Sequence, residues 1–573
     1  MADPRHSSGT VDPFGGTLVA VGGAAMLVAL VTWLSAQLCL VLTGAGWQSA
    51  PFDESPRLVF DLLTGHDVRR AWASTYPRAD ALTEAWLFWL LVIALTGLLA
   101  AACTWGVLRW TGSDRRQKVD PARWANRRQE RRIAVKESPA DRPWRLVAGR
   151  GRASRRLLAG DDCVSAVVFG PNGSGKTTSL IVPNVLDWDG PVVMTTAKPQ
   201  DLEPICSARA AHGPVWVIAP GGAPGGKVVG WSPIAASYDD ETADRMAEWM
   251  VESSGMNTDP KARPWNAQAR KYLKGLLLAT HLSSGGVDEW TQWIHSGERA
   301  RDTVEDVLLS ADHAATAREY ASTWQIHEEG KGSVLFTALG LADTYSRPGV
   351  RAAVDGGGFQ VDALLEESGT LCIVTPSGEG DRFAPYFTAL VSSIIHAAET
   401  RAAEAGGPIN PRLLMALDEA GNVFRYPRLP HLLTTARGNG IQLLLIYHDI
   451  AQVEHLYGGR EVARTVLSNA KMRMLLPGVG DLDTLRYWSE LMGRTRTQTH
   501  GETHGEDGRR SRSRSEHTDA LAPLHMLQQL PDGQAVLIYQ NLPPARVRLL
   551  PWFKNRRYRD FHAAAQNHVE ASS

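Results

Sequence analysis

The residues best suited to chemistry lie in one short glycine-rich segment. The run from Gly170 to Thr177 reads GPNGSGKT and fits the pattern GxxxxGK[ST] in full. Small residues let backbone N–H groups wrap around phosphate oxygens, while the lysine and the hydroxyl reach a nucleotide and its magnesium ion. The pattern predicts an ATP-binding loop (P-loop, or Walker A motif) made by Gly170, Pro171, Asn172, Gly173, Ser174, Gly175, Lys176, Thr177 and Thr178.

Two flanking elements must position this loop. The apolar run 164–170 predicts a buried strand before it, and the residues from Thr177 to about Trp188 predict a helix after it. The positive end of that helix would face the phosphates. We expect Lys176 to reach the β- and γ-phosphates and the Thr177 hydroxyl to ligate Mg²⁺.

A second pair of candidate residues lies far along the chain. The run Leu413–Leu417 predicts a buried strand that ends in two carboxylates, Asp418 and Glu419. This is the pattern of a Walker B motif, in which Asp418 would hold Mg²⁺ through water and Glu419 would polarise the attacking water. Asp418 follows Lys176 by 242 residues, whereas one strand–helix–strand unit needs only about 30. A large insertion is therefore expected between the two motifs.

Periodicity locates that insertion. Residues 239–344 are rich in helix formers, with apolar residues recurring at a helical period. Short apolar runs on both sides predict further strands at 191–195, 215–218, 370–374, 443–447, 472–476 and 535–539. The pattern favours a largely parallel sheet with an all-α domain spliced into it. We expect the aromatic and methionine-bearing helix faces to form a bundle core, and a partner surface is the alternative.

Two long uncharged segments lie near the N-terminus. Residues 17–43 and 85–108 each exceed the ~20 residues that a helix needs to cross a bilayer. A cleavable signal peptide is the alternative for the first, but its apolar run is too long and a second run follows. Between Arg109 and Arg156 lie 16 Lys and Arg against five Asp and Glu, and basic residues near span ends stay in the cytoplasm. We expect two spans in the cell membrane, with both termini and the ATPase domain cytoplasmic; the basic stretch could also hold anionic lipid headgroups.

The overall charge hides an uneven distribution. The chain of 573 residues has 60 Lys and Arg against 61 Asp and Glu, but residues 1–160 hold 21 against 13 and residues 161–573 hold 39 against 48. The acidic remainder argues against a uniformly basic DNA-binding surface, so any DNA contact must be local, such as the lining of a ring channel. Five widely spaced cysteines argue against a disulfide scaffold and a zinc site, and they favour a reducing compartment.

The chain resembles the coupling-protein ATPases of conjugative type IV secretion systems, the TraG/TraD-like family. The similarity is carried by GPNGSGKTT, the following LIVPNVLDWDGPVVMTTAKPQDL, WSPI at 231–234, LLMALDEAGN at 413–422 and ARGNGIQLLLIYHDIAQVEHLYG at 436–458. The two spans and the inserted helices match the family's architecture, up to about residue 550. The resemblance implies a membrane-anchored homo-hexameric ring that uses ATP to pump DNA–relaxase complexes, or proteins, into the secretion channel.

The resemblance also implies roles for two more residues. Arg437 lies on the helix after Walker B, where the family places an arginine finger that stabilises transition-state charge on the neighbouring subunit's ATP. A surface arginine is the alternative. The strand 443–447 ends in His448, where the family usually carries a glutamine that senses the γ-phosphate. Histidine can hydrogen-bond phosphate or water but titrates at about pH 6.5. A satisfied polar residue beside Asp449 is the alternative.

The segment 494–517 is polar and contains an Arg–Ser repeat. Such tracts can bind nucleic acid. We expect a mobile solvated loop instead.

These patterns predict an α/β P-loop NTPase of the RecA-like type, with an inserted all-α domain and an N-terminal two-helix transmembrane region. The expected parts are a membrane anchor at 1–110, a basic linker at 111–160, ATPase segments at 161–235 and 351–555, the all-α domain at 236–350 and a polar tail at 556–573. The expected function is a motor that couples ATP hydrolysis to substrate translocation. A double-stranded DNA pump of the chromosome-segregation type and a nucleotide-binding receptor without productive hydrolysis are the alternatives.

Overall fold

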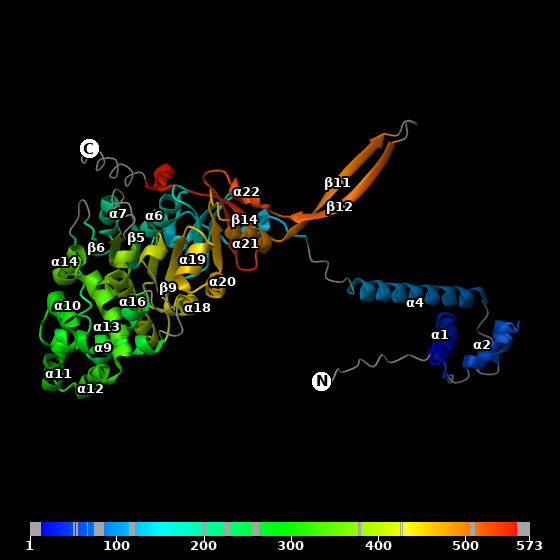
Figure 1. The fold of residues 1–573 in the computed structure, drawn as a ribbon. Helices are drawn as coiled ribbons and strands as arrows, with labels where there is room; N and C mark the ends of the chain where they lie inside the picture. Colours follow the sequence, from blue (N-terminus) through cyan, green and yellow to red (C-terminus); the bar gives the residue numbers. More distant parts are fainter. Residues whose placement is uncertain are drawn as a thin grey trace. The chain divides into compact units, whose positions relative to one another are not determined.

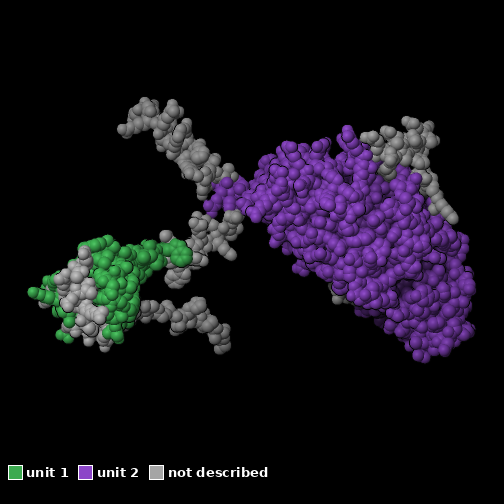
Figure 2. All heavy atoms as spheres, turned by 180° about the vertical axis from the view of Figure 1, so that it is seen from behind, with its two compact units in different colours: residues 1–120 green, residues 121–573 purple. Residues whose placement is uncertain are grey.

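The computed structural model places the chain in two compact units, Met1–Asp120 and Pro121–Ser573, drawn in green and purple in Figure 2. The structure describes residues 13–49, 52, 55–65, 67–73, 85–113, 121–196, 202–222, 228–254, 263–375, 380–423, 426, 428–504 and 510–558.

Two long apolar helices dominate the first unit, α1 (Pro13–Leu42) and α4 (Ala85–Ser113). Two short helices lie between them in sequence, α2 (Ser55–Leu63) and α3 (Val68–Ala73). Mean hydropathy is 2.2 over residues 25–42 and 2.3 over residues 85–105. Both predicted spans are therefore helices long and apolar enough to cross a membrane, and α4 continues beyond the predicted end at residue 108.

A 12-stranded sheet forms the centre of the second unit, in the order β1-β3-β2-β14-β13-β10-β4-β9-β8-β5-β7-β6. Seven neighbouring strands run parallel: β10 (Met472–Leu475), β4 (Ala166–Phe169), β9 (Ile441–Tyr447), β8 (Leu413–Leu417), β5 (Val192–Thr196), β7 (Thr370–Val374) and β6 (Val215–Ile218). The others pair antiparallel: β1 (Ala134–Val135), β3 (Leu157–Ala159), β2 (Val147–Gly151), β14 (Ala545–Arg548) and β13 (Gln534–Tyr539). The predicted fold class, with its largely parallel sheet, is confirmed.

Helices cover both faces of the parallel strands. Successive strand residues point to opposite faces, so Phe169 and Met415 belong to one apolar core, whereas Val168 and Ala416 belong to another. Both faces being buried explains the continuous apolar runs in the sequence. The covering helices are α6 (Val182–Leu186), α7 (Leu202–Arg209), α16 (Gly380–Glu404), α17 (Ala420–Val423), α18 (Leu429–Asn439), α19 (Ile450–Tyr457), α20 (Arg460–Asn469), α21 (Leu482–Met492) and α22 (Leu524–Gln528).

Between β6 and β7 the chain leaves the sheet and forms a helical insertion, whose α9–α13 gather at one end of the second unit in Figure 1. Its helices are α8 (Asp240–Ser253), α9 (Arg263–Leu282), α10 (Val287–Ser296), α11 (Arg301–Ser310), α12 (Ala314–Ala321), α13 (Glu328–Tyr345), α14 (Pro348–Gly356) and α15 (Val361–Glu366). Buried aromatic rings join them: Tyr272 stacks on Tyr320 at 5.5 Å between ring centroids, and Trp290 packs edge-on against Tyr345 at 5.2 Å. The interpretation of these aromatic faces as bundle core is confirmed.

Residues 111–160 were predicted to be a basic linker. From Pro121 onward this prediction is wrong, because the chain there is part of the folded second unit. Strands β1, β2 and β3 lie in this stretch and extend the main sheet on its antiparallel side. Leu146, Ala148 and Leu158 are buried there. Arginines placed between these apolar residues obscured the short strand pattern in the sequence.

The Arg–Ser segment also differs from the expected loop. Two antiparallel strands, β11 (Arg494–His504) and β12 (Arg510–Ala520), form a separate two-stranded sheet, visible in Figure 1 as a long hairpin. Threonine recurs at alternate positions of β11 from Thr495, and β-branched residues favour extended backbone. Of the predicted polar tail, residues 556–558 form a short 3₁₀ turn and the remainder lies outside the described residues.

Candidate nucleotide-binding site

The glycine-rich loop begins where β4 ends. The Gly170 N–H donates to the carbonyl of Tyr447 on the neighbouring strand β9, at 3.1 Å. A Cβ atom at Gly170 would lie 2.7 Å from Ser174 Oγ and 2.9 Å from Leu476 Cβ, so no side chain fits there. Gly175 has φ +90°, a backbone conformation that glycine adopts without steric cost. Both glycines are therefore required by the shape of the loop.

The helix after the loop starts in an unusual form. Residues 177–181 make a π-helical turn, in which the Val182 N–H donates to the Thr177 carbonyl, and α6 continues only to Leu186. The sequence predicted an uninterrupted α-helix to about Trp188. Pro183 accounts for the difference, because it has no N–H and cannot make the α-helical bond to the residue four positions earlier.

The parallel arrangement brings both predicted motifs to one edge of the sheet. Strands β4 and β8 flank β9, so the residues that follow all three strands lie at the same edge. The Thr177 hydroxyl donates to the carboxylate of Asp418 across 241 residues of sequence. This hydrogen bond joins the predicted Walker A and Walker B motifs.

Backbone contacts fix the two carboxylates. The Thr195 hydroxyl on β5 donates to the backbone carbonyl of Asp418 at 2.7 Å. Glu419 has φ +51°, which is strained for a residue with a side chain, and its N–H donates to Asp418 Oδ1 at 3.1 Å. Lys176 is 5% exposed, with Nζ 3.4 Å from Asn172 Oδ1. No pattern in the sequence pointed to Thr195, because its contact with Asp418 depends on the order of the strands in the sheet.

A cavity of about 120 Å³ lies between these groups, lined by Asn172, Gly173, Gly175, Lys176, Thr177, Thr178, Asp418 and Glu419. Burial raises the pKa of Asp418, and the Thr177 hydrogen bond and the Lys176 charge act in the opposite direction. A buried carboxylate whose charged form is disfavoured gains from a cation. The hydroxyl of Thr177 and the carboxylate of Asp418 suit Mg²⁺, which typically takes one or two protein ligands together with water and phosphate oxygens.

His448 follows β9, between the two motifs. It is half-buried and its N–H donates to Gln452 Oε1 at 2.9 Å, but it does not line the 120 Å³ cavity. Asp449 caps α19 by accepting from the Gln452 N–H at 2.8 Å. Gln452 was missed as a neighbour of His448, although the pattern D-x-x-Q is a recognisable signal at a helix start.

Arg437 lies at the other edge of the sheet. It is exposed in the last turn of α18, which ends just before β9 begins. Burial and the neighbouring Asp162 raise the pKa of Cys163, which precedes β4, whereas the charges of Arg412 and Arg437 lower it. The seven residues of β9 span about 23 Å. The Arg437 guanidinium therefore cannot reach the P-loop of its own chain.

A buried ion-pair cluster attaches other segments to the P-loop helix. Asp187, at the C-terminal end of α6, pairs with Arg142, and both side chains are buried. Arg557 also contacts Asp187, at 3.0 Å between Nη2 and Oδ1. Sequence reasoning missed this cluster, because its members come from three distant segments.

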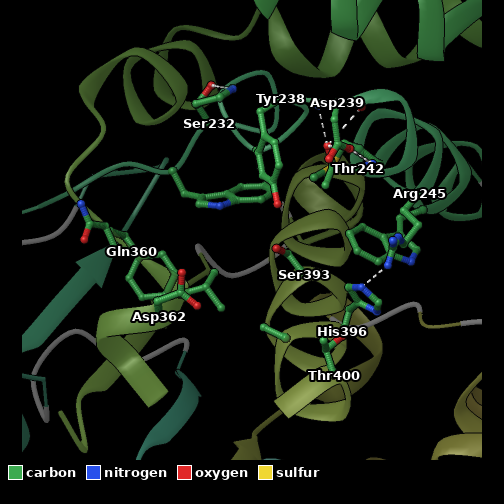
Figure 3. Close-up of a pocket in the computed structure, with 18 of the residues that line it drawn as sticks. Ser232, Tyr238, Asp239, Thr242, Arg245, Gln360, Asp362, Ser393, His396 and Thr400 are labelled. Carbon is green, nitrogen blue, oxygen red and sulfur yellow. Dashed lines mark hydrogen bonds between the residues drawn. The ribbon is translucent and has the colours of Figure 1, made fainter. Parts of the chain in front are cut away.

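A larger cavity, of about 1050 Å³, lies along α8 and α16 (Figure 3). The two arginines of its lining already have partners: Arg245 contacts Glu241 and His396, and Arg401 contacts Asp362 at 2.7 Å. Burial and the charge of Arg245 lower the pKa of His396. The neutral ring can then accept from the guanidinium, as the dashed line in Figure 3 indicates. No P-loop or Walker B residue lines this cavity.

Comparison with known proteins places this geometry in a family. The model of the family described as "Type IV secretory system Conjugative DNA transfer" matches residues 117–573. The chain belongs to this family. The resemblance to conjugative coupling proteins is thus confirmed, together with the nucleotide-binding P-loop class.

Individual members of the coupling-protein family are distant from this chain. The conjugal transfer protein TraG of Escherichia coli is 26% identical over 355 residues, which cover 57% of this chain and 55% of that protein. TraG of Agrobacterium fabrum is 24% identical, covering 68% of this chain and 60% of that protein. The chain thus spans little more than half the length of these relatives.

Solved structures of the family share the fold. The bacterial conjugative coupling protein TrwBdeltaN70, in an unbound monoclinic form, has a TM-score of 0.55 and 16% identity, covering 75% of this chain and 92% of that chain. TrwB in complex with ADP and Mg²⁺ has a TM-score of 0.53 and 17% identity, covering 75% of this chain and 94% of that chain.

Proposed function

We propose that this coupling-protein family member is a membrane-anchored motor that hydrolyses ATP to move DNA, as a relaxase-bound single strand, or a protein substrate, into a type IV secretion channel. The observation that carries the proposal is the hydrogen bond between Thr177 and Asp418 beside the buried Lys176. This contact joins the two motifs that the proposed ATPase site requires, which lie 241 residues apart in the sequence.

The residues of the cavity divide the chemistry between them. Loop N–H groups and Lys176 bind the phosphates of ATP, and Lys176 offsets their charge. Thr177 and Asp418 would hold Mg²⁺, which supplies further charge neutralisation at the phosphates when bound. Glu419 accepts a proton from the attacking water. TrwB, with the same fold, has been solved with ADP and Mg²⁺, and the donor set here suits the same pair.

Assembly of several copies completes the site. Arg437 cannot reach the nucleotide of its own chain, so its proposed role as an arginine finger requires a neighbouring subunit. A closed homo-hexameric ring, as the family resemblance implies, would bring Arg437 of each subunit to the next subunit's P-loop. His448, at the same edge as the P-loop, is proposed to sense the γ-phosphate after a small movement toward the cavity.

The two apolar helices are proposed to anchor the motor in the cell membrane, with both termini and the ATPase domain in the cytoplasm. Residues 109–156 carry the basic excess that favours this topology. Proposed partners are DNA with its relaxase or protein substrates, components of the secretion channel and membrane lipid.

Measurement of ATP hydrolysis by the full chain in detergent or nanodiscs tests the proposal, without DNA and with single- or double-stranded DNA. We expect hydrolysis that Glu419→Gln removes while nucleotide binding persists. Stimulation by double-stranded DNA alone would favour the chromosome-segregation type of pump. Nucleotide binding with no hydrolysis in any condition, and with Glu419→Gln indistinguishable from wild type, would leave only the receptor alternative.

A further inference from the structure

A basic groove of about 500 Å³ lies on the antiparallel side of the sheet, outside the nucleotide site. Its lining comes from strands β2 and β14, from the residues that follow each of these strands, and from residues 532–534. Six cations line the groove against one carboxylate, Asp532: Arg150, Arg152, Arg155, Arg546, Arg548 and Lys554. The cluster comes from two distant parts of the sequence, so no single basic run predicted it.

The fold holds these cations close together. Arg150 and Arg548 are direct cross-strand partners, an arrangement that is unfavourable for like charges. The Arg152 N–H donates to the Arg546 carbonyl at 2.9 Å. Burial and the charge of Arg152 lower the pKa of Arg546. The concentration of positive charge therefore has an energetic cost that a bound anion would relieve.

Carboxylates of the protein neutralise little of this charge, although the Arg546 guanidinium stacks on the Trp124 ring at 4.2 Å. Arg150 pairs with Glu137 at 2.8 Å. Among the residues that the structure describes, no carboxylate forms an ion pair with Arg152, Arg155, Arg546, Arg548 or Lys554. The groove differs in this respect from the cavity along α8 and α16, where the arginines are paired.

A buried carboxylate holds the backbone on one side of the groove in place. Glu130 is 2% exposed and accepts from the N–H groups of Ala153, at 3.2 Å, and Ser154, at 2.5 Å. A Cβ atom at Gly151 would lie 2.4 Å from Glu130 Oε2, so glycine is needed for this contact. A buried carboxylate thus fixes the turn that carries Arg152 and Arg155. Such preorganised cations are suited to binding phosphate rather than to remaining solvated.

Three observations favour phospholipid over nucleic acid as the source of that phosphate. The groove lining contains no aromatic side chain on which bases could stack. On its border Phe553 is 41% exposed, with the Lys554 ammonium 5.8 Å from its ring, a combination typical of membrane–water interfaces. The arginines of β2 also belong to the basic sequence that follows the second apolar helix.

We propose that this basic groove binds the phosphate headgroups of anionic phospholipids. The proposal rests on the proposed membrane anchoring of the chain. It goes beyond anchoring, because it assigns the folded ATPase unit its own lipid contact at named residues.

Hydrogen exchange of the full chain in nanodiscs tests this assignment. Discs of phosphatidylcholine alone are compared with discs containing one third phosphatidylglycerol. We expect exchange in peptides covering 150–156 and 545–554 to slow several-fold with the anionic lipid. The triple variant Arg152→Gln/Arg155→Gln/Arg548→Gln should lose this protection. The matched variant Lys271→Gln/Arg299→Gln/Arg318→Gln, which removes three exposed charges from the insertion, should retain it.

Two measurements distinguish an incorrect assignment of the groove from an incorrect assignment of the membrane anchor. Incorporation into phosphatidylcholine discs reports on the apolar helices alone, and unchanged exchange in the core strands β4 and β8 verifies folding of each variant. No protection by phosphatidylglycerol in incorporated wild-type protein would overturn the proposal. Protection by soluble glycerol phosphate alone would assign the groove to a free phosphate, and protection by duplex DNA alone would assign it to nucleic acid. Either result would overturn it as well.

Discussion

The cavity along α8 and α16 and the P-loop cavity differ in size and in the residues that line them, and the smaller one holds the P-loop and Walker B residues. The cavity along α8 and α16 has about 1050 Å³, but Arg245 and Arg401 there already have carboxylate partners. The P-loop cavity has about 120 Å³, and its Asp418 is met by a hydroxyl and a backbone N–H. The comparison teaches that a candidate reactive site is recognised by the kinds of residues that its lining brings together, here a lysine, a hydroxyl and two adjacent carboxylates at a glycine-rich loop, and not by its volume.

The backbone of the smaller cavity is also strained. Glu419 keeps a left-handed conformation, which costs on the order of 1–3 kcal/mol for a residue with a side chain. Strand order and hydrogen bonds must offset that cost. This favours Glu419 as a group whose position matters for the reaction.

Removing the P-loop lysine or the Walker B glutamate should give the largest effect. We expect Glu419→Gln to lower ATP hydrolysis by about 10⁴-fold, near the upper limit for loss of a general base. Lys176→Ala should lower it by about 10³-fold, as for loss of one preorganised group that offsets charge on the phosphates. Lys176→Ala should also weaken nucleotide binding, whereas Glu419→Gln should not. A phosphate-release assay and nucleotide titration measure the two effects. Residual hydrolysis within tenfold of wild type in both variants would contradict the assignment of the smaller cavity.

Arg437 tests whether the smaller cavity is complete within one chain. We expect Arg437→Ala to lower hydrolysis by about 10³-fold, as for loss of an arginine finger. Mixing it with Lys176→Ala subunits should restore part of the activity, because each variant supplies what the other lacks. A surface arginine would give wild-type rates in the Arg437→Ala variant alone, and that outcome would remove the argument for a shared site.

Replacing Asp418 should raise the stability of the ligand-free protein while it removes a proposed Mg²⁺ ligand. Because burial raises its pKa, the charged form is disfavoured in the fold, so the ligand-free protein gains stability as pH falls toward that raised pKa. Asp418→Asn removes the buried charge. Without nucleotide or Mg²⁺ at pH 7.5 the variant should therefore melt higher than wild type, by on the order of 2 °C.

Calorimetry across pH checks this prediction. The difference in melting temperature should shrink as the pH is lowered, and Mg²⁺ with nucleotide should stabilise the wild type only. A lower melting temperature for Asp418→Asn at pH 7.5 would mean that the carboxylate is already compensated within the protein.

The sequence was sufficient for features that depend on local pattern. Apolar runs located the parallel strands because both faces of those strands are buried, and the rule that parallel strands end at one edge brought Lys176 and Asp418 together. The sequence did not predict contacts between segments that are distant in the chain. The Thr195 bond to Asp418 and the Asp187 cluster depend on strand order and on which segments fold back. Strands β1 to β3 were hidden because their apolar residues are few and arginines intervene.

The larger cavity should give the smallest effect, and it decides whether the comparison holds. His396→Gln keeps a side-chain oxygen that can accept from Arg245, and His396 does not line the P-loop cavity. We therefore expect ATP hydrolysis to change less than about twofold, as for a substitution away from the reacting groups. The substitution should instead change how the stability of the fold depends on pH. With its pKa lowered by burial and by Arg245, His396 stays neutral in the fold while the unfolded chain takes up a proton below about pH 6.5. Wild type therefore loses stability as pH falls through that value, and His396→Gln should lose less between pH 7 and pH 5, measured by thermal unfolding. A tenfold loss of hydrolysis with unchanged stability would instead give the larger cavity a part in the motor cycle, and the residue types in the two linings would then fail as the criterion that separates the two cavities.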